Sequence, residues 1–377
     1  MSSKKKFIGE VDESKLSGSA LHVNDGVEQP PNINPGYKKP VSVSSLLSKQ
    51  EYFDGIINGN RAILGKAITL VESRLPVHQQ MAQELIAMCL PLSDKSVRIG
   101  ITGVPGVGKS SFIESLGMQI IGEGRKLAVL AVDPSSERSK GSILGDKTRM
   151  EQLAAAEQAF IRPSPSAGSL GGVARKTRET IILCEAAGFD TIFIETVGVG
   201  QSETVVHSMV DFFLLLMLSG AGDELQGIKR GIMEMADAIA INKADGDNIK
   251  KAQMARQQYE SALHLFPPTK SGWMPKVLTC SALNNSGIKE VWQTIEEYIN
   301  KTINSGYFIE NRNEQALFWM HQSIKEALQN KFYQNSEIES FLSDFENQIR
   351  LRKKSSFVAA QELLDKYFEI IKKQKQN

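Results

Sequence analysis

The feature that most constrains the fold is the glycine-rich segment GITGVPGVGKSS, at residues 100–111. It contains the pattern Gly-x-x-x-x-Gly-Lys-Ser, follows the apolar run VRIGIT (97–102) and leads into a helical pattern. A strand, a loop of this kind and a helix in this order form a phosphate-binding loop, or P-loop. Its glycines let backbone N–H groups point at phosphate oxygens, and the helix N-terminus adds a partial positive charge. The segment therefore predicts a nucleotide site.

Two side chains of this loop have specific expected roles. Lys109 should reach the β- and γ-phosphates, and the hydroxyl of Ser110 should ligate Mg²⁺. The other predicted nucleotide contacts of the loop are Gly103, Val104, Pro105, Gly106, Val107, Gly108 and Ser111.

Six short apolar runs alternate with helical segments through the middle of the chain. Continuous apolar strands separated by helices indicate a mainly parallel sheet that is covered on both faces. We therefore predict an α/β fold of the P-loop nucleotide-hydrolase type, with its domain at residues 94–300. The runs lie at 97–102, 126–133, 191–197, 212–218, 238–242 and 276–282.

The regions on either side of this domain differ from it in pattern. Residues 1–40 are polar and predict a disordered lead-in. Residues 41–93 predict helices, with one pattern (61–75) that stops at Pro76 and a second (78–90) that stops at Pro91. Residues 301–377 predict only helices, whose apolar stripes could pack on this chain or on a second copy. The stripes are Leu317, Met320, Ile324 and Leu328; Ile338, Phe341, Phe345 and Ile349; and Ala360, Leu364, Tyr367 and Ile371.

The base of the nucleotide is predicted from the segment AIAINKAD (238–245). The carboxylate of Asp245 can accept hydrogen bonds from two N–H donors of guanine. Adenine has neither donor and would leave a buried carboxylate unpaired. Asn242 is expected to tie this loop to the P-loop, and the stem of Lys243 to cover the base. The loop TCSAL (279–283) follows the sixth run, and Ser281, Ala282 and Leu283 are expected to offer backbone N–H groups to guanine. Together these motifs predict that the ligand is GTP or GDP.

The segment FIETVGVGQSE (193–203) is expected to respond to the γ-phosphate. Glu195 ends a buried strand and would hold Mg²⁺ directly or through water. Gly198 would bring its N–H near the γ-phosphate. Gln201 does not follow this glycine directly, so no residue at the strand end is obviously placed to hold the attacking water. We therefore expect slow hydrolysis by the free protein and faster hydrolysis with a partner.

Further candidate switch residues lie in loops. Asp133 (in AVDPSS) and Asp146 (in GSILGDKTRM) could be Mg²⁺ ligands, water-orienting acids or turn residues. The segment LSGAGDELQGIKRG (218–231) is either a solvated loop or a loop that delivers Gln226 or Lys229 to the nucleotide when a partner binds.

The composition limits which classes of partner and which cellular compartment the sequence predicts. The formal net charge is +1, from 44 basic and 43 acidic residues, which predicts no attraction to nucleic acid or to an anionic membrane. The longest apolar run (212–218) is far shorter than the roughly 20 residues that span a bilayer. The N-terminus has neither the apolar core of a signal peptide nor the acid-poor composition of a transit peptide. The cysteines, Cys89, Cys184 and Cys280, are widely spaced, which is typical of a reduced cytoplasmic protein.

Seven segments in order resemble one known family. They are GITGVPGVGKSS, VDPSS, GSILGDKTRM, RPSPSAGSLGG, ETVGVGQSE, GAGDELQGIKRG and NKAD, and the chain is similar through them to the methylmalonyl-CoA mutase-associated GTPases, the MeaB/ArgK family. The resemblance implies a homodimeric GTPase with an N-terminal helical extension (41–93) and a C-terminal helical dimerisation arm (301–377). It implies a chaperone of an adenosylcobalamin-dependent mutase, with methylmalonyl-CoA mutase the expected client. The GTPase would gate cofactor loading and protect or reactivate the mutase, and this chain alone is not expected to hold cobalamin.

The resemblance also implies roles for individual residues. By position, Ser110, Asp133, Asp146 and Glu195 match the magnesium site, and the loop with Asp223 matches a third switch. The implied catalytic residues are Lys109, Asp133, Asp146, Glu195, Gln226 and Lys229. The chain departs from the family pattern at ENRNEQ (310–315), which is less basic than expected, so the contacts of that segment are left open.

Three other functions are weighed against this one. A kinase or ATPase linked to arginine/ornithine transport is disfavoured by NKAD, which selects guanine. A nickel-inserting metallochaperone GTPase needs clustered Cys and His, whereas His22, His78, His207, His264 and His321 are scattered. A structural dimer without turnover would fail a single-turnover hydrolysis assay.

Overall fold

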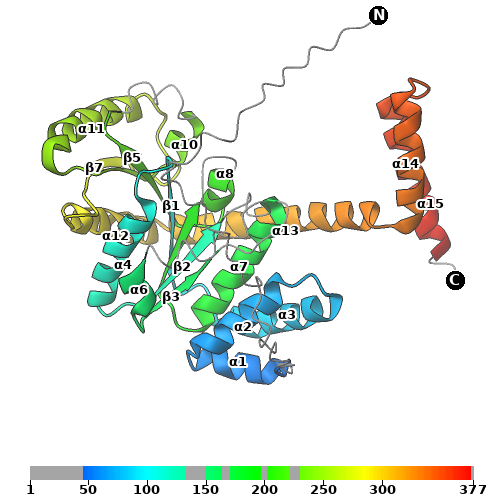
Figure 1. The fold of residues 1–377 in the computed structure, drawn as a ribbon, viewed down its shortest axis with the longest axis horizontal. Helices are drawn as coiled ribbons and strands as arrows, with labels where there is room; N and C mark the ends of the chain where they lie inside the picture. Colours follow the sequence, from blue (N-terminus) through cyan, green and yellow to red (C-terminus); the bar gives the residue numbers. More distant parts are fainter. Residues whose placement is uncertain (1–45, 133–149, 164–169, 197–201, 221–229, 375–377) are drawn as a thin grey trace, which may run out of the picture. The chain divides into compact units, whose positions relative to one another are not determined.

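Seven parallel strands form the central sheet in the order β3-β2-β4-β1-β5-β6-β7 (Figure 1). This confirms the predicted α/β fold. Six strands overlap the six apolar runs, whereas β3 was not predicted because only three apolar residues, 159–161, mark it in the sequence. The strands are β1 (Val97–Gly103), β2 (Leu127–Val132), β3 (Ala159–Arg162), β4 (Thr191–Thr196), β5 (Phe212–Leu218), β6 (Ala238–Asn242) and β7 (Lys276–Thr279).

The structure is a computed structural model, and it describes residues 46–132, 150–163, 170–196, 202–220 and 230–374. Leu47–Asn377 form one compact unit. The predicted lead-in (1–40) lies outside the described residues. The helices are α1 (Lys49–Ile57), α2 (Arg61–Glu72), α3 (Pro76–Cys89), α4 (Lys109–Gly122), α6 (Glu151–Ala155), α7 (Leu170–Ala186), α8 (Ser202–His207), α10 (Arg230–Met235), α11 (Ile249–Leu263), α12 (Ile288–Ser305), α13 (Tyr307–Tyr333), α14 (Ser336–Arg350) and α15 (Ser356–Gln374).

Helices cover both faces of the sheet, with a separate core on each face. Strand β4 shows the alternation: Ile192 and Ile194 belong to the core under α1–α3, α7 and α8, whereas Phe193 belongs to the core under α4, α6 and α12. A third core lies between the β5–β6 end of the sheet and α11. Because both faces are buried, the strands are mostly apolar, and their polar residues lie at or next to the strand ends.

The N-terminal helices α1–α3 pack on α7 and on one another. Ser48 and Glu51 form a capping box that begins α1. Pro76 was expected to end the first helical pattern (61–75), but α2 already ends at Glu72. Pro76 instead begins α3, where its missing N–H costs no hydrogen bond.

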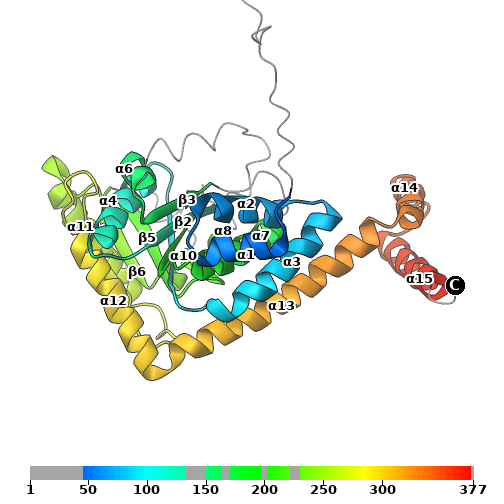
Figure 2. The same ribbon diagram turned by 90° about the horizontal axis from the view of Figure 1, so that it is seen from below.

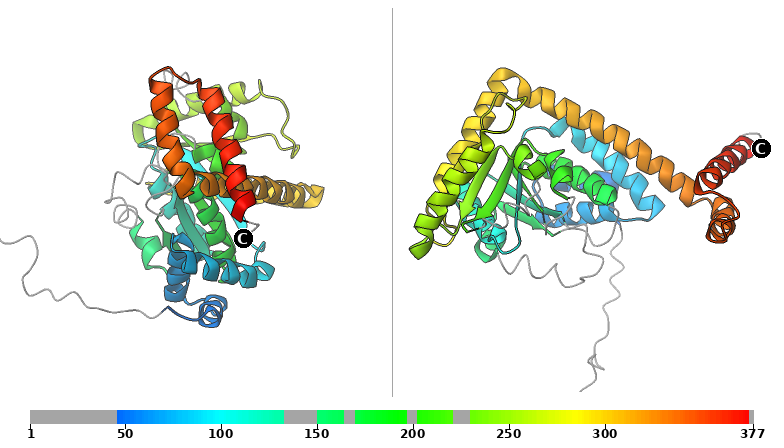
Figure 3. Two further views of the ribbon diagram at one scale, coloured as in Figure 1. Left: turned by 90° about the vertical axis from the view of Figure 1, so that its right-hand side faces the viewer. Right: turned by 90° about the horizontal axis from the view of Figure 1, so that it is seen from above.

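The C-terminal helices start from a sharp bend. Gly306, at a φ of 81°, separates α12 from α13, and Figure 2 shows the two helices meeting there. Helix α13 has 27 residues, and α14 and α15 form a hairpin next to its C-terminal end (Figure 3). Its buried residues are Arg312, Gln315 and Trp319.

The predicted apolar stripes of these helices have different outcomes. On α14, Ile338 and Phe345 are buried as expected. On α15 the buried face is Ala359, Leu363, Tyr367 and Ile370, so the prediction was wrong by one position at three of four residues. Adjacent apolar pairs such as Leu363–Leu364 make the two faces indistinguishable by pattern. The α13 stripe, Leu317, Met320, Ile324 and Leu328, is exposed.

Candidate nucleotide-binding site

The P-loop turns between β1 and α4 at positions where a side chain would not fit. A Cβ on Gly103 would lie 2.5 Å from the carbonyl oxygen of Leu216 in the neighbouring strand β5. Gly108 has a φ of 89°, and a Cβ there would lie 3.0 Å from Nδ2 of Asn242. Val107 is fully buried and anchors the loop in the core beneath α4. The sequence therefore folds locally into a tight loop against β5 and β6.

Lys109 is the first residue of α4 and bends back over the loop. Its Nζ donates to the carbonyl oxygen of Gly103 at 2.9 Å. Burial lowers the pKa of Lys109, and the negative charges of Glu195 and Glu203 oppose this shift. The ammonium group is thus held above the loop, in the field of two carboxylates.

Asn242, at the end of β6, joins the P-loop to the guanine loop. Its Nδ2 donates to the carbonyl oxygen of Val107 at 2.8 Å, which confirms the predicted tie to the P-loop. Its Oδ1 accepts from the N–H of Ala282 at 3.1 Å. The side chain is almost completely buried. One amide therefore fixes three loops that come from separate parts of the chain.

Asp245 is oriented by the loop that follows β7. The hydroxyl of Ser281 donates to Oδ2 of Asp245, and the N–H of Asn284 donates to the same hydroxyl at 3.2 Å. Ser281 is fully buried, so this contact is protected from water. The carboxylate is thereby held by a side chain that the guanine motif alone does not contain.

A cavity of about 770 Å³ lies at these loops. Its size is within the range of small-molecule sites. Leu283 is 83% exposed at its edge. The lining includes Gly108, Ser111, Asn242, Lys243, Asp245, Ala282 and Leu283 from the predicted set, together with Ser115, Met118, Asn285 and Ile288.

Glu195 lies near the C-terminal end of β4, between β1 and β2. It pairs in register with Ile101 of β1 and Ala131 of β2, and it is 5% exposed. The neighbouring hydroxyls of Thr102 and Thr196 lie 2.8 Å apart and join β1 to β4. The P-loop, with Ser110 after it, follows the C-terminal end of β1 and so lies at the same edge of the sheet as Glu195. Carboxylate and hydroxyl oxygens are ligands that Mg²⁺ prefers, so this pair of residue types fits the ion.

The remaining predicted site residues lie outside the described part of the chain. Their roles stay predictions. They are Asp133, Asp146, Gly198, Gln201, Asp223, Gln226 and Lys229.

Two features of the site were not predicted. Glu203, on α8, is 2% exposed and contributes to the field at Lys109. The hydroxyl of Ser115 donates to Oδ1 of Asn285 at 2.5 Å and joins α4 to the guanine loop. Ser115 belongs to no motif, and the only signal for Glu203 was that it is the last residue of the segment FIETVGVGQSE (193–203).

The comparison with protein families decides the assignment. The family model described as methylmalonyl Co-A mutase-associated GTPase MeaB matches residues 64–337. The chain belongs to this family. It is therefore a P-loop GTPase, as the relatives also indicate: the GTPase ArgK of Escherichia coli is 50% identical over 283 residues, which are 75% of this chain and 86% of that protein.

Two further relatives of this MeaB-family GTPase show the range of names in the family. The mouse (Mus musculus) protein called methylmalonic aciduria type A homolog, mitochondrial, is 44% identical over 323 residues, which are 80% of this chain and 78% of that protein. A crystal structure described as LAO/AO transport system kinase is 40% identical, with a TM-score of 0.68, and the match covers 85% of this chain and 99% of that one. Among the residues that the structure describes, no helix combines the length and the apolar character that a membrane span requires.

Proposed function

We propose that this GTPase is a chaperone of an adenosylcobalamin-dependent mutase, with methylmalonyl-CoA mutase as the client. The observation that carries the proposal is the family match over residues 64–337, whose description names that mutase. The name of the mouse relative refers to the disorder methylmalonic aciduria and points to the same metabolism. In this role, GTP binding and hydrolysis gate cofactor loading and protect or reactivate the mutase.

The proposed nucleotide site uses the residues that the loops bring together. Asp245 selects guanine, and its orientation by Ser281 supports this role. Lys109 binds the β- and γ-phosphates. Ser110 and Glu195, with Asp133 and Asp146, would hold Mg²⁺, which would neutralise phosphate charge. Backbone N–H groups of residues 103–111, except Pro105, orient the triphosphate.

Hydrolysis is proposed to be slow without the client and faster with it. The basis is the sequence of the strand end, where Gln201 is separated from Gly198 by two residues. Gln226 and Lys229, in the loop with Asp223, would complete the site when the mutase binds. The mutase would read the nucleotide state through the switch loops.

We also propose that the protein forms a homodimer through α13. The support is its stripe of apolar side chains, with Leu317, Ile324 and Leu328 58%, 49% and 60% exposed. Apolar residues that recur on one face of a helix favour burial against a partner. A second copy presents the same stripe and can pair with it symmetrically.

A second candidate is a kinase linked to transport, because a related structure carries that description. The Asp245–Ser281 arrangement favours guanine over adenine, so this candidate predicts a nucleotide preference that the site does not support. Competition between GTP and ATP for the purified protein separates the two functions. A preference for ATP would overturn the chaperone proposal.

The chaperone role is tested by mixing the purified protein with methylmalonyl-CoA mutase. We expect GTP hydrolysis to rise when the mutase is added, and transfer of adenosylcobalamin to the mutase to depend on GTP. The Lys109→Ala variant should not bind GTP and should support neither effect. An unchanged rate of hydrolysis together with nucleotide-independent cofactor transfer would contradict the proposal.

A further inference from the structure

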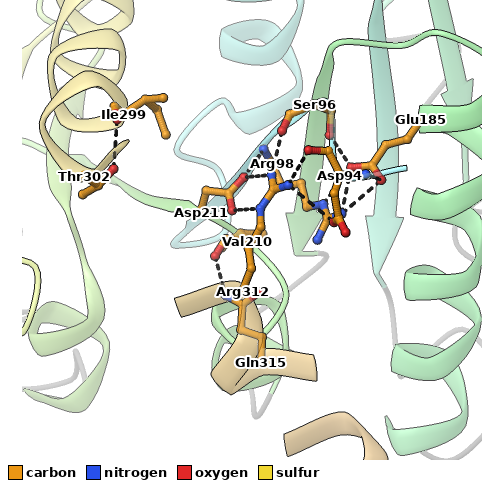
Figure 4. A network of polar contacts seen from close by, with 10 residues as sticks. All are labelled: Asp94, Ser96, Arg98, Glu185, Val210, Asp211, Ile299, Thr302, Arg312 and Gln315. Atoms are coloured by element: carbon orange, nitrogen blue, oxygen red, sulfur yellow. Dashed lines mark hydrogen bonds and ion pairs between the residues drawn. The ribbon is translucent and has the colours of Figure 1, made fainter. Parts of the chain in front are cut away.

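The N-terminal half of α13 is bonded to the turn between α8 and β5. Arg312 donates from Nε and NH2 to the two carboxylate oxygens of Asp211, at 2.8 and 2.7 Å. Gln315 Nε2 donates to the carbonyl oxygen of Val210 at 2.7 Å, as Figure 4 shows. Trp319 Nε1 donates to the carbonyl oxygen of Ser208 at 3.0 Å. We call these three residues and their partners Ser208, Val210 and Asp211 the arm latch.

The arm latch belongs to a larger buried network of charges (Figure 4). Arg312 also donates to the backbone carbonyl oxygens of Asp94 and Ser96, at 3.0 and 2.6 Å. Arg98, on β1, donates through its backbone N–H to Asp211 at 2.8 Å, and its guanidinium pairs with Glu185 at 2.9 and 3.0 Å.

This geometry makes the latch rigid and specific. Arg312 is 9% exposed and Asp211 is 5% exposed. A bidentate pair between a guanidinium and a carboxylate fixes orientation as well as distance, and burial makes each lost bond costly. A lysine at position 312 would keep the charge but lose the planar fork. A small displacement of the turn must therefore either move α13 or break the latch.

The other end of the same segment adjoins the nucleotide site. Helix α8 follows Glu195 in the chain, and its Glu203 contributes, with Glu195, to the field at Lys109. The helix packs closely on β1, because a Cβ on Gly100 would lie 3.0 Å from Val206. The segment from Ser202 to Asp211 thus packs on β1, the strand that leads into the P-loop, and ends in the arm latch.

We propose that α8 and the arm latch couple the nucleotide state of the site to the position of α13. A change at the nucleotide site that shifts α8 is carried to α13 through Asp211 and the carbonyl groups of Val210 and Ser208. The proposal rests on the GTPase activity and not on the choice of client, so its failure leaves the mutase assignment intact. Coupling is reciprocal, so weakening the latch must also change the affinity for nucleotide.

The first measurement is the ratio of the affinities for GDP and for a non-hydrolysable GTP analogue, in full-length protein and in Arg312→Lys. Couplings of this kind typically change an affinity at least about 5-fold. We therefore expect the ratio in the variant to change by about 5-fold or more. Trp319→Phe removes one bond of the latch and keeps most of the ring packing, so it should shift the ratio in the same direction by less. Trp319→Phe also tests the proposal if Arg312→Lys does not fold.

The second measurement is the distance between spin labels at Lys250→Cys on α11 and Lys331→Cys on α13, in protein diluted with unlabelled chains. We expect a different distance distribution with GDP and with the analogue, and loss of that difference in Arg312→Lys. The control is Glu185→Gln, which breaks the network at α7 and not at the latch. We expect this variant to have a lower stability and an unchanged ratio of the two affinities. Equal ratios in the native and latch variants, or a native distance that is the same with both nucleotides, would overturn the proposal.

Discussion

At the scale of single residues, the site depends on side chains that orient other side chains. Asn242 holds the P-loop and the guanine loop together, and Ser281 holds the carboxylate of Asp245. Each orienting group is buried, so water does not compete for its hydrogen bonds. A site of this kind binds its ligand without first having to order the loops, which favours affinity.

Asp245 is expected to determine the choice of base. In Asp245→Ala, two charge-assisted hydrogen bonds to guanine are lost, each worth about 1.5–3 kcal/mol. GTP should therefore bind at least about 100-fold more weakly, and the preference over ATP should disappear. Titration calorimetry with both nucleotides measures this. Asp247→Ala, at an exposed position in the same loop, should bind GTP like the native protein.

Asp237 is expected to make stability depend on pH. Its carboxylate accepts from the N–H of Phe213 at 2.8 Å, and burial raises its pKa from 3.8 to about 7. The folded state therefore holds a proton between about pH 4 and pH 7 that the unfolded chain has lost. Stability from this group is complete below about pH 4 and is lost as the pH rises through 7.

We expect the free energy of unfolding to fall by about 2 kcal/mol over this range, less than the full pKa difference would give, because Asp237 keeps some contact with solvent. Urea unfolding at several pH values measures the change. Asp237→Asn should remove this part of the pH dependence. The same slope in both proteins would show that another group is responsible.

At the scale of elements, helix α8 lies against β1 only because residue 100 is glycine. A Cβ there would approach the ring of Phe213 to 2.7 Å, Val206 to 3.0 Å and Val210 to 3.1 Å. Since Phe213 and Val210 belong to or adjoin β5, the added atom would press on the strand as well as the helix. Close packing at this point is the condition for α8 to stay next to the P-loop.

Gly100→Ala is therefore expected to destabilise the protein by about 1–3 kcal/mol, the usual cost of overpacking a core. Urea unfolding measures the change. Gly65→Ala is the matched control, because position 65 lies inside α2 with no atom within 4 Å of the added Cβ. There the same substitution should be neutral or stabilising, by up to about 1 kcal/mol. Equal changes in the free energy of unfolding at both positions would mean that α8 can move away from the added Cβ without loss of stability.

Local patterns predicted most of the sheet and the loops of the site. The P-loop, the NKAD loop and the acidic strand end are short, and each carries its own spacing. The arm latch was not predictable, because Arg312 and Asp211 are 101 residues apart and no spacing rule joins them. The segment ENRNEQ was left open for lack of arginines, yet its Arg312 is the residue that forms the latch. For the same reason, no local pattern marked Ser281 as a partner of Asp245.

At the scale of the whole molecule, α13 combines two functions on two faces. One face carries the buried latch residues, and the other carries the exposed stripe. If the stripe pairs two chains, the nucleotide sites of the dimer are connected to the dimer interface through one helix. The state of assembly and the state of the nucleotide are then not independent.

Ile324→Glu is expected to separate the dimer into monomers, because it places a charge in the middle of the apolar stripe. Sedimentation equilibrium measures the mass. Lys325→Glu, at the next and already charged position, should leave the dimer intact. Basal GTP hydrolysis should persist in both variants, since neither residue lies at the nucleotide site. A dimeric Ile324→Glu protein would place the interface elsewhere.

Because α13 is long, a small tilt near the bend at Gly306 produces a large displacement at the far end of the helix. From Arg312 to Tyr333 the helix rises by about 30 Å, at about 1.5 Å per residue. A tilt of about 5° at Arg312 would then move the far end by about 3 Å, roughly the width of one side-chain contact. A very small displacement at the P-loop would therefore change which side chains contact one another at the α14–α15 hairpin. Helix α13 would act as a lever that pivots at the buried ion pair of Arg312 and Asp211.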